Sequence, residues 1–555
     1  MSETSNDLVI SPPRYSALLS SNYPPNALEK ATIQRDIIKL EDRLSRMRSA
    51  VSPVRSLLPE ILGQIFEAAV MVQDAPRERV DSARVVDLSL VCKAWRAAAE
   101  MTHSLWADVL IAKPGPRIFD KVVAWMGRAG TTPKTLRIRL SNPDCCFWGH
   151  LSAWTKFPGH PDSLCVLDAA PLLELLTEGL QLDTFEISVR SSFCLRLLLL
   201  RVQEETSKGS PWMSLRSLDL RICDQEHQEP QRWWNWQEPS DPSASMFNHL
   251  PSSLTSLRIR FPSQPQLILS RPQTYYIPIN IPASTLRNLI SITIACDWEG
   301  PQIARLLQHC TRVEYLDIDY GIGSSSRQLW TRKETAFAQY DLPHRLHFPE
   351  LRTLKVHHIP SCAAEHVLHF IDAPALSRIH VGIKEVKDVE GPGGDDEGEP
   401  LTIIRPTYLF LDSLGLLHPP RATILQSLTI SNQDFFEKGF SGKAFISILW
   451  PLLSLTHLTV VGDTAGDSFA VMRWCMDDQQ TLLLPCLEHL EIADCYEIFP
   501  LESLLRFIEA RHRRYDAFAE GDKAPDSDIK DVATLEEDCE SASAVELVRG
   551  MGIAK

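Results

Sequence analysis

The sequence predicts an α/β fold in which a small N-terminal α-helical unit precedes a curved solenoid with a parallel sheet. Two patterns predict it. Apolar residues recur at helical spacing between residues 57 and 106, and beyond residue 110 an apolar triplet recurs with helical stripes between its copies. Strands that alternate with helices favour parallel pairing, because the chain must cross over before the next strand can lie beside the last.

Length and composition set the broad class of protein. The chain has 555 residues, of which 44% are hydrophobic and 23% charged, an ordinary globular composition with room for several units. The net charge of −15 argues against nucleic acid or an anionic membrane as a partner. The scattered cysteines, the polar N-terminus and the lack of a long apolar stretch predict a cytoplasmic or nuclear protein.

The N-terminal part begins with residues 1–25, which are rich in Ser, Pro and Asn and are predicted to be disordered. Residues 26–52 are predicted to form a leader helix whose apolar residues alternate at spacings of four and three, as in a short coiled coil. These residues are Ile33, Ile37, Leu40, Leu44, Met47 and Val51. The seam is short, so self-pairing and packing beside the next unit are both open.

Residues 53–110 have the pattern of a small helical module. Pro59 suits the first turn of a helix, and Glu60 suits its positive end. Two apolar stripes follow at helical spacing, formed by Ile61, Leu62, Ile65 and Phe66 and then by Leu88, Val91, Cys92 and Trp95. Helices this short cannot bury their stripes alone, so they must pack on a partner or, as a plain cap, on the rest of the chain.

The order of residues in this module resembles the F-box family. It runs Leu58-Pro59-Glu60-Ile61-Leu62, then Val91-Cys92-Lys93-Ala94-Trp95-Arg96, then Leu105-Trp106. The charged leader helix and the Ser52-Pro53 break resemble fungal members. The resemblance implies docking on a Skp-type linker protein, and through it on a cullin. The matching contact residues are Leu58, Pro59, Ile61, Leu62, Ile65, Leu90, Val91, Cys92 and Trp95. Phe66 and Trp106 are expected to hold the module's own fold.

Beyond residue 110, an apolar residue is followed three and five positions later by two more. The copies are Leu182-Phe185-Ile187, Leu215-Leu218-Leu220, Leu254-Leu257-Ile259, Leu289-Ile292-Ile294, Val313-Leu316-Ile318, Leu351-Leu354-Val356, Leu376-Ile379-Val381, Leu425-Leu428-Ile430, Leu455-Leu458-Val460 and Leu487-Leu490-Ile492, with a degenerate copy at Thr135-Leu136-Arg137-Ile138. Helical stripes lie between them, such as Ile303-Leu306-Leu307, Ala364-Val367-Leu368-Ile371 and Leu504-Leu505-Ile508. The pattern therefore predicts one strand per copy, with helices between strands.

This triplet resembles the leucine-rich repeat, and Cys223 and Cys495 follow two copies where that motif has Asn or Cys. The resemblance implies an irregular leucine-rich-repeat solenoid over residues 111–515, each strand burying its apolar edge against its neighbours. Many copies lie further apart than in that family, so insertions are needed. The longest gap holds an expected acidic loop at residues 386–400. A generic α/β domain is the alternative.

Two further segments have distinct compositions. Residues 224–245 are polar but contain Trp233, Trp234 and Trp236, which could either anchor a partner or plug the edge of the solenoid. Residues 516–555 form an acidic tail, rich in Ser and Ala, that is predicted to be disordered.

No strong catalytic signature occurs in the sequence. It has neither a nucleophile elbow nor a phosphate-binding glycine loop. Cys145, Cys146, His150 and His160 lie close in sequence, but adjacent cysteines are awkward ligands for one tetrahedral ion and the spacing matches no common zinc finger. We therefore expect a protein that is not an enzyme and that holds no metal or cofactor.

Strand alternation predicts which side chains would meet a protein substrate. The second and third triplet residues point inward, so the residues that flank them line the concave face. The candidates are Asp219, Arg221, Arg258, Arg260, Tyr315, Asp317, Asp319, Lys355, His357, Arg378 and His380, with Thr429, His457, Thr459 and Glu491 in later copies. Basic and acidic residues alternate in bands along this face. Either the bands complement the charges of a partner, or the side chains are simply solvated.

Together the two resemblances imply a substrate-recognition adaptor of a cullin–RING (SCF-type) E3 ubiquitin ligase. The helical module would dock on the linker protein, and the repeats would bind a protein substrate for ubiquitination by holding it near the conjugating enzyme. The first alternative is a leucine-rich-repeat protein-binding scaffold that acts outside any ubiquitin ligase. An enzyme whose site leaves no mark in the sequence is the third class.

Overall fold

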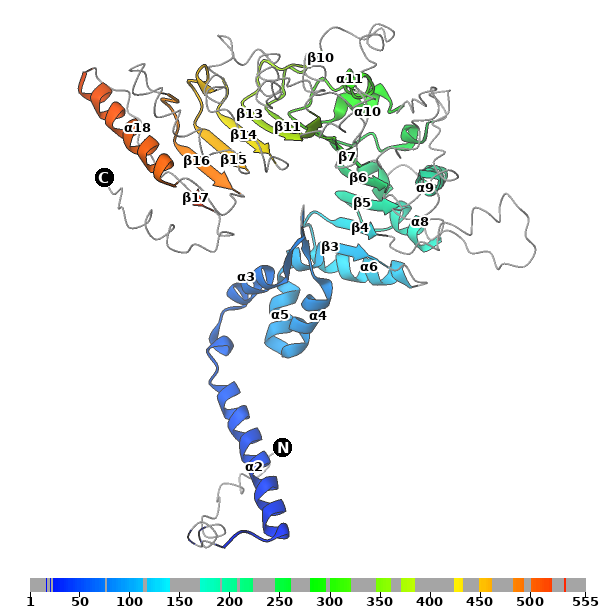
Figure 1. The fold of residues 1–555 in the computed structure, drawn as a ribbon. Helices are drawn as coiled ribbons and strands as arrows, with labels where there is room; N and C mark the ends of the chain where they lie inside the picture. Colours follow the sequence, from blue (N-terminus) through cyan, green and yellow to red (C-terminus); the bar gives the residue numbers. More distant parts are fainter. Residues whose placement is uncertain are drawn as a thin grey trace, which may run out of the picture. The chain divides into compact units, whose positions relative to one another are not determined.

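The computed structural model describes residues 16, 20, 23–74, 77–112, 117–139, 170–189, 192–206, 210–222, 245–260, 280–295, 300–320, 346–360, 371–384, 424–432, 449–461, 483–493, 501–521 and 534–535. The chain divides into two compact units, Met1–Leu105 and Trp106–Lys555, whose elements are labelled in Figure 1. The predicted boundary at residue 110 is wrong, because strand β3, Asp108–Ile111, already belongs to the large sheet of the second unit.

The first unit begins with α2, Ala27–Ala50, where the leader helix is predicted. Asn26 caps it reciprocally with Glu29. The Asn26 side chain accepts a hydrogen bond from the Glu29 backbone N–H at 2.9 Å, and the Glu29 carboxylate accepts one from the Asn26 N–H at 2.9 Å. Such exchange satisfies donors that a helix start leaves unpaired. A short 3₁₀ turn, η1, Pro53–Ser56, follows the helix.

Three short helices build the rest of this unit. They are α3 (Pro59–Val70), α4 (Ser82–Val91) and α5 (Lys93–Met101), and they contact one another. The 3₁₀ turn η2 (His103–Trp106) follows α5. Between α3 and α4 lies an antiparallel hairpin formed by β1 (Met71–Asp74) and β2 (Arg77–Val80). The Asp81 carboxylate caps α4 by accepting from the N–H groups of Ala83 and Arg84.

Among the described residues of the second unit, 13 strands form one sheet in which all neighbouring strands pair in parallel. The strands are β3, β4 (Thr135–Arg139), β5 (Thr184–Val189), β6 (Ser217–Ile222), β7 (Ser256–Arg260), β8 (Ser291–Ala295), β9 (Tyr315–Asp319), β11 (Thr353–Pro360), β13 (Arg378–Lys384), β14 (Ser427–Asn432), β15 (His457–Val461), β16 (His489–Ala493) and β17 (Thr534–Leu535). Each predicted triplet places its second and third residues on a strand of its own. The predicted α/β class with a parallel sheet is therefore confirmed.

Helices cover one face of this sheet. They are α6 (Ile118–Met126), α8 (Ala170–Thr177), α9 (Ser192–Glu205), α10 (Ala283–Asn288), α11 (Gly300–Leu307) and α18 (Leu501–Gly521), with the 3₁₀ turns η3 (Gly127–Ala129), η5 (Pro211–Ser214) and η7 (Met246–His249). Figure 1 shows α6, α8 and α9 along one side of the strands. Helix residues such as Val122 and Leu198 share one apolar core with inward strand residues such as Leu218. The alternate strand residues therefore form the opposite face, here called the polar face.

Some expectations need correction in detail. Ile371, expected on a helical stripe, lies on a two-residue strand, β12, Ile371–Asp372, which pairs in parallel with β10, Leu346–His347. Helix α18 continues to Gly521, and β17 lies further on, so residues 516–555 are not wholly disordered. The acidic loop at 386–400, the Trp233–Trp236 group, Cys223 and Cys495 lie outside the described residues. Within the described part of the chain, no helix combines the length and apolarity needed to cross a bilayer.

Candidate functional site

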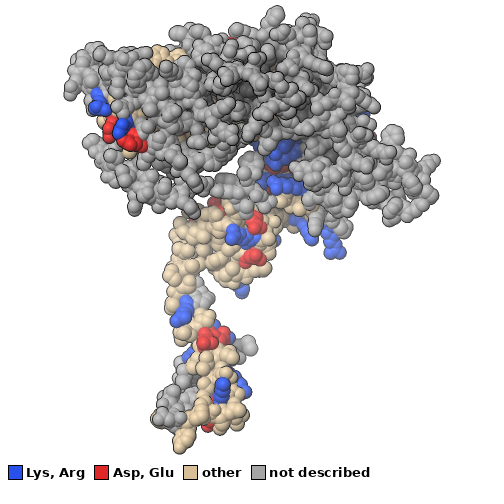
Figure 2. Space-filling model, viewed as in Figure 1, with Lys and Arg blue, Asp and Glu red and all other residues tan. Residues whose placement is uncertain are grey.

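Apolar side chains stand exposed on the helices of the first unit. Leu58, at the start of α3, is 65% exposed, and Leu90 and Val91, at the end of α4, are 64% and 60% exposed. Ile61 and Ile65 are also exposed on α3. Ile61 lies three residues after Leu58, and Ile65 lies four residues after Ile61, so the three share one helix face. Figure 2 shows a surface without charged residues over α3 in this view. The exposed residues Leu58, Pro59, Ile61, Ile65, Leu90, Val91 and Cys92 are here called the docking face.

The core of the same unit uses the neighbouring helical positions. Leu62, predicted to contact the linker protein, is only 4% exposed and packs inside the unit, so that part of the prediction is wrong. Phe66 is 1% exposed, and its ring lies 5.0 Å from that of Trp95, centroid to centroid. Trp95 is thus partly occupied by the unit's own packing. Ile61 and Leu62 are adjacent, and helical geometry points only one of them inward.

Trp106, expected to hold the helical module, instead lies in the second unit. It is 1% exposed, with its ring centroid 4.6 Å from that of Trp125 and the Arg128 guanidinium 4.5 Å from its centroid. The stacked cation stabilises the indole by attraction to its electron-rich face. Trp106 therefore packs against α6 and η3 of the second unit.

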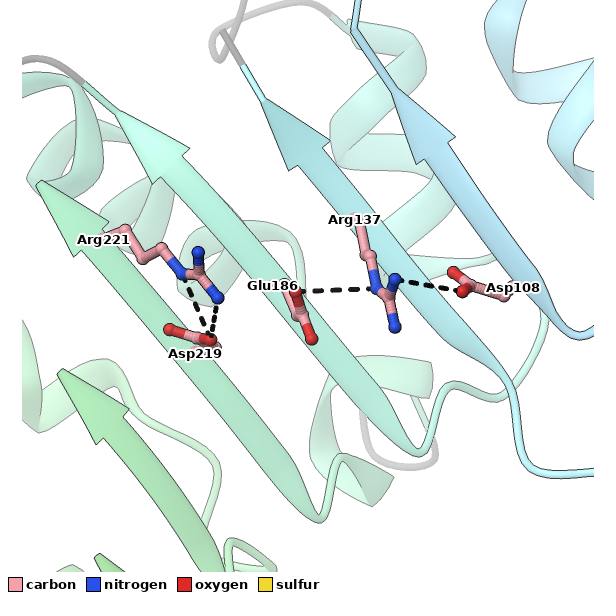
Figure 3. Close-up of polar contacts among 5 residues, drawn as sticks. All are labelled: Asp108, Arg137, Glu186, Asp219 and Arg221. Carbon is pink, nitrogen blue, oxygen red and sulfur yellow. Dashed lines mark hydrogen bonds and ion pairs between the residues drawn. The ribbon is translucent and has the colours of Figure 1, made fainter. Parts of the chain in front are cut away.

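Buried charges connect the first strands across the polar face (Figure 3). Arg137 on β4 lies between Asp108 on β3, with Nη1 3.1 Å from Oδ2, and Glu186 on β5, with Nε 3.5 Å from Oε2. All three side chains are at most 14% exposed. None of them was among the predicted site residues. The rule that found later positions would have found Arg137 and Glu186, which lie between the inward residues of their strands.

Asp219 and Arg221 form a second pair, on β6 alone. Arg221 Nη2 lies 3.2 Å from Asp219 Oδ2, and Asp219 is only 1% exposed. Asp219 therefore cannot offer its carboxylate to a substrate, and this part of the prediction is wrong. Its position fixes the Arg221 guanidinium instead, because a charge-assisted bond within one strand restricts the arginine rotamer.

The sheet register brings the remaining predicted substrate residues into lateral rows. Asp219 lies opposite Arg258 and Arg221 opposite Arg260 on β7. Asp317 on β9 lies opposite Lys355 on β11, and Lys355 in turn lies opposite His380 on β13. Arg260 and Arg378 are exposed, whereas Arg258, Tyr315, Asp317, Asp319, Lys355, His357 and His380 are partly exposed. Adjacent parallel strands thus collect side chains from distant parts of the chain on one surface.

A histidine cluster forms where β11 departs from regular pairing. The register shifts after Val356, and His358 adopts φ 54°, a conformation that few non-glycine residues adopt. The His358 Nδ1 atom lies 2.7 Å from Asp319 Oδ1, and His357 Nε2 lies 3.5 Å from Asp317 Oδ1. The His357 and His380 rings lie 4.5 Å apart, centroid to centroid. The cluster therefore combines imidazole and carboxylate groups from three strands.

Burial controls the protonation of this cluster. It lowers the pKa of His380 to about 3, with repulsion from His357 and Lys355 adding to the effect. Burial also lowers the pKa of His357, outweighing the opposite effect of Asp317 and Asp319. Nearby, burial and Asp317 raise the pKa of Tyr315 to about 12, so its hydroxyl stays a donor to Asp317 Oδ2 at 3.3 Å. At neutral pH, His357 and His380 are thus uncharged hydrogen-bonding groups.

The later copies carry mostly neutral groups. Thr459 donates to Glu491 Oε2 at 2.9 Å, and the His457 and His489 rings lie 5.5 Å apart. Thr429 lies opposite His380 on one side and Thr459 on the other. The described residues hold no group of three or more His, Cys, Asp or Glu suited to a metal ion. Cys145, Cys146, His150 and His160 lie outside the described residues.

Comparisons with known proteins add little to this geometry. No known family model matches the chain, and no curated protein matches it. Among solved structures, the chain is similar to one in a crystal structure of a TLR13–ssRNA13 complex, with 16% sequence identity and a TM-score of 0.24. The match covers 60% of this chain and 41% of that one. A TM-score this low carries no argument about fold or function.

Proposed function

We propose that this protein is a substrate-recognition adaptor of a cullin–RING E3 ubiquitin ligase and that its F-box lies within residues 53–110. The observation that carries the proposal is the docking face. Leu58, Ile61 and Leu90 match the family's linker-contact pattern and are exposed, while Leu62 and Phe66, one helical position away, fill the core. Apolar residues that a helix leaves open to water are typical of a surface that a partner covers.

The docking face supports the proposal because the sequence order and the exposure agree on the same side chains. Burying Leu58, Leu90 and Val91 would each contribute roughly 1 to 2 kcal/mol. Phe66 and Trp95 pack against each other in the neighbouring core, and a surface that is already formed loses little conformational entropy on binding. The proposed partner is a Skp-type linker protein and, through it, a cullin.

We further propose that the second unit is an irregular leucine-rich-repeat solenoid whose polar face binds the protein substrate. The parallel sheet and the one-strand-per-triplet arrangement support this reading. Arg258 and Arg260 offer cations from β7, and Asp319 offers a carboxylate from β9. A substrate with complementary charges would be held at a fixed place, which raises the local concentration of its lysines at the conjugating enzyme.

The ligase connection is tested by affinity capture from cells treated with a proteasome inhibitor. The full chain should co-purify with a Skp-type linker and a cullin, and Leu58→Ala/Pro59→Ala should remove both. Met101→Ala is the matched control, because Met101 is 56% exposed but lies outside the docking face. Capture of other proteins without any linker or cullin would favour a scaffold outside the ligase.

Substrate binding has its own test. Arg258→Glu/Arg260→Glu should reduce the substrates captured with the protein while leaving linker and cullin unchanged. Both residues are at least partly exposed, and circular dichroism of the purified variant checks that it still folds. Unchanged substrate capture would exclude this part of the polar face.

A further inference from the structure

An apolar stripe along α2 is open to solvent. Its residues Ile37, Leu40, Leu44 and Met47 are 47%, 47%, 44% and 53% exposed. Together with Ile33 they repeat at spacings of four and three residues, the pattern with which one helix packs on another. A helix with such a stripe is stabilised when a second helix covers it.

The charges beside the stripe discriminate between possible arrangements. Asp36 and Arg43 each directly precede an apolar seam residue, whereas Glu41 and Arg48 each directly follow one. In a parallel pair of α2 helices, the preceding position of one copy faces the following position of the other, five residues along. Asp36 would then face Glu41, and Arg43 would face Arg48. Two copies in parallel would thus repel each other along both flanks of the seam.

An antiparallel pair removes this repulsion. With Ala27 of one copy opposite Ala50 of the second copy, the helices overlap along their whole length. Ile37 then packs on Leu40 of the second copy. In an antiparallel pair, like flanking positions face each other, so Asp36 of each copy lies opposite Arg43 of the other. The two helix dipoles also oppose, which adds a small favourable contribution.

We propose that α2 pairs with α2 of a second copy of this chain, in antiparallel orientation, through Ile33, Ile37, Leu40 and Leu44. Four apolar layers then form the centre of the pair. Further out, Met47 lies opposite Lys30, whose aliphatic stem covers it while the ammonium group stays in water. The inference does not depend on the ligase proposal, because a scaffold protein would pair in the same way.

Sedimentation equilibrium of the full chain tests the pairing. The unmodified protein should form dimers, and Arg43→Glu should weaken them about tenfold, because two attractive contacts become repulsive. Arg35→Glu is the matched control, since Arg35 is exposed on the outer face of the same helix, and it should leave the dimer unchanged. Asp36→Arg/Arg43→Glu should restore dimerisation. A monomer at every concentration, or an oligomer larger than a dimer, would overturn the proposal.

Orientation is read from two further results. Asp36→Arg should weaken an antiparallel pair, whereas it would strengthen a parallel one by facing Glu41. A photo-crosslinking amino acid at Gln34, which leaves the seam intact, should react with the second copy near Glu41. Reaction near Glu29 would mean parallel helices and would contradict the proposed geometry.

Discussion

Arg137 on β4 reaches Asp108 on β3, with 3.1 Å between Nη1 and Oδ2, and these side chains are 10% and 14% exposed. On its other side, Glu186 on β5 lies 3.5 Å from the Arg137 Nε atom. One guanidinium therefore connects three adjacent strands (Figure 3). Because charges this far from water are costly unless paired, the loss of the shared cation would leave two carboxylates close together.

We predict that Arg137→Met destabilises the second unit by about 3 kcal/mol, the usual cost of removing one partner from a buried ionic network. The measurement is the midpoint of urea unfolding followed by circular dichroism. Arg260→Met makes the same change at an exposed position and should shift the midpoint little. If Arg137→Met has an equally small effect, the three-strand connection does not contribute to stability.

Leu62 and Ile61 are adjacent on α3 but should respond differently to truncation. Leu62→Ala removes a buried side chain and should cost roughly 2 to 5 kcal/mol. Ile61→Ala should change stability by about 0.5 kcal/mol or less yet weaken binding of the linker protein. Thermal unfolding and linker binding, measured on both variants, check this separation. A large loss of stability in Ile61→Ala would show that Ile61 belongs to the core.

Gly382 on β13 leaves room for the side chain of Ser431 on β14. A Cβ atom at Gly382 would lie 2.8 Å from Ser431 Oγ and 3.4 Å from His357 Cα. Gly382→Ala should therefore cost about 1 to 3 kcal/mol, as other overpacked positions do. The double variant Gly382→Ala/Ser431→Ala should recover most of this, because the hydroxyl that clashes is gone. A double-mutant cycle on urea midpoints measures the recovery, and strictly additive losses would contradict the proposed clash.

His380 should make stability depend on pH. Its pKa is lowered to about 3 in the folded protein, mainly by burial, whereas a free histidine titrates near about 6.5. The unfolded chain therefore binds the proton more readily. The contribution of His380 is complete above about pH 6.5 and is lost as the pH falls towards about 3.

His380→Asn should lose less stability than the unmodified protein between about pH 7 and about pH 5. Urea midpoints at the two pH values give the comparison. His457→Asn, at an exposed position, is the control and should keep the pH dependence of the unmodified chain. If the His380 variant and the unmodified chain show the same pH dependence, burial does not lower the pKa of His380 in the folded protein.

The parallel sheet could be predicted because strand alternation is local. On β6, for example, the inward residues Leu218 and Leu220 flank the outward residue Asp219. Neighbouring strands stack such inward pairs into one core. Strand β3 escaped prediction because its triplet begins with Trp106 and its outward residue, Leu110, is also apolar. With no polar residue between Val109 and Ile111, the alternation that marks a strand disappears.

The candidate sites could be predicted less completely. Periodicity placed Ile61 and Leu62 on the same stripe, but which of the two is buried depends on packing against α5. The outward direction of Asp219 was predictable, yet its burial depends on surrounding structure, which no local pattern records. The contact between His357 and His380 depends on the register shift after Val356, and such irregularities leave little trace in sequence.

The most direct test of the adaptor proposal is the affinity between the purified full chain and a purified Skp-type linker protein, measured by isothermal titration. Tight, one-to-one binding is expected. Ile61→Ala/Leu90→Ala should weaken it by roughly 100-fold, which is the loss expected for two contacts worth about 1 to 2 kcal/mol each. If the folded, unmodified chain does not bind the linker, or if the double variant binds as tightly, the docking face is not an F-box surface and the adaptor proposal is wrong.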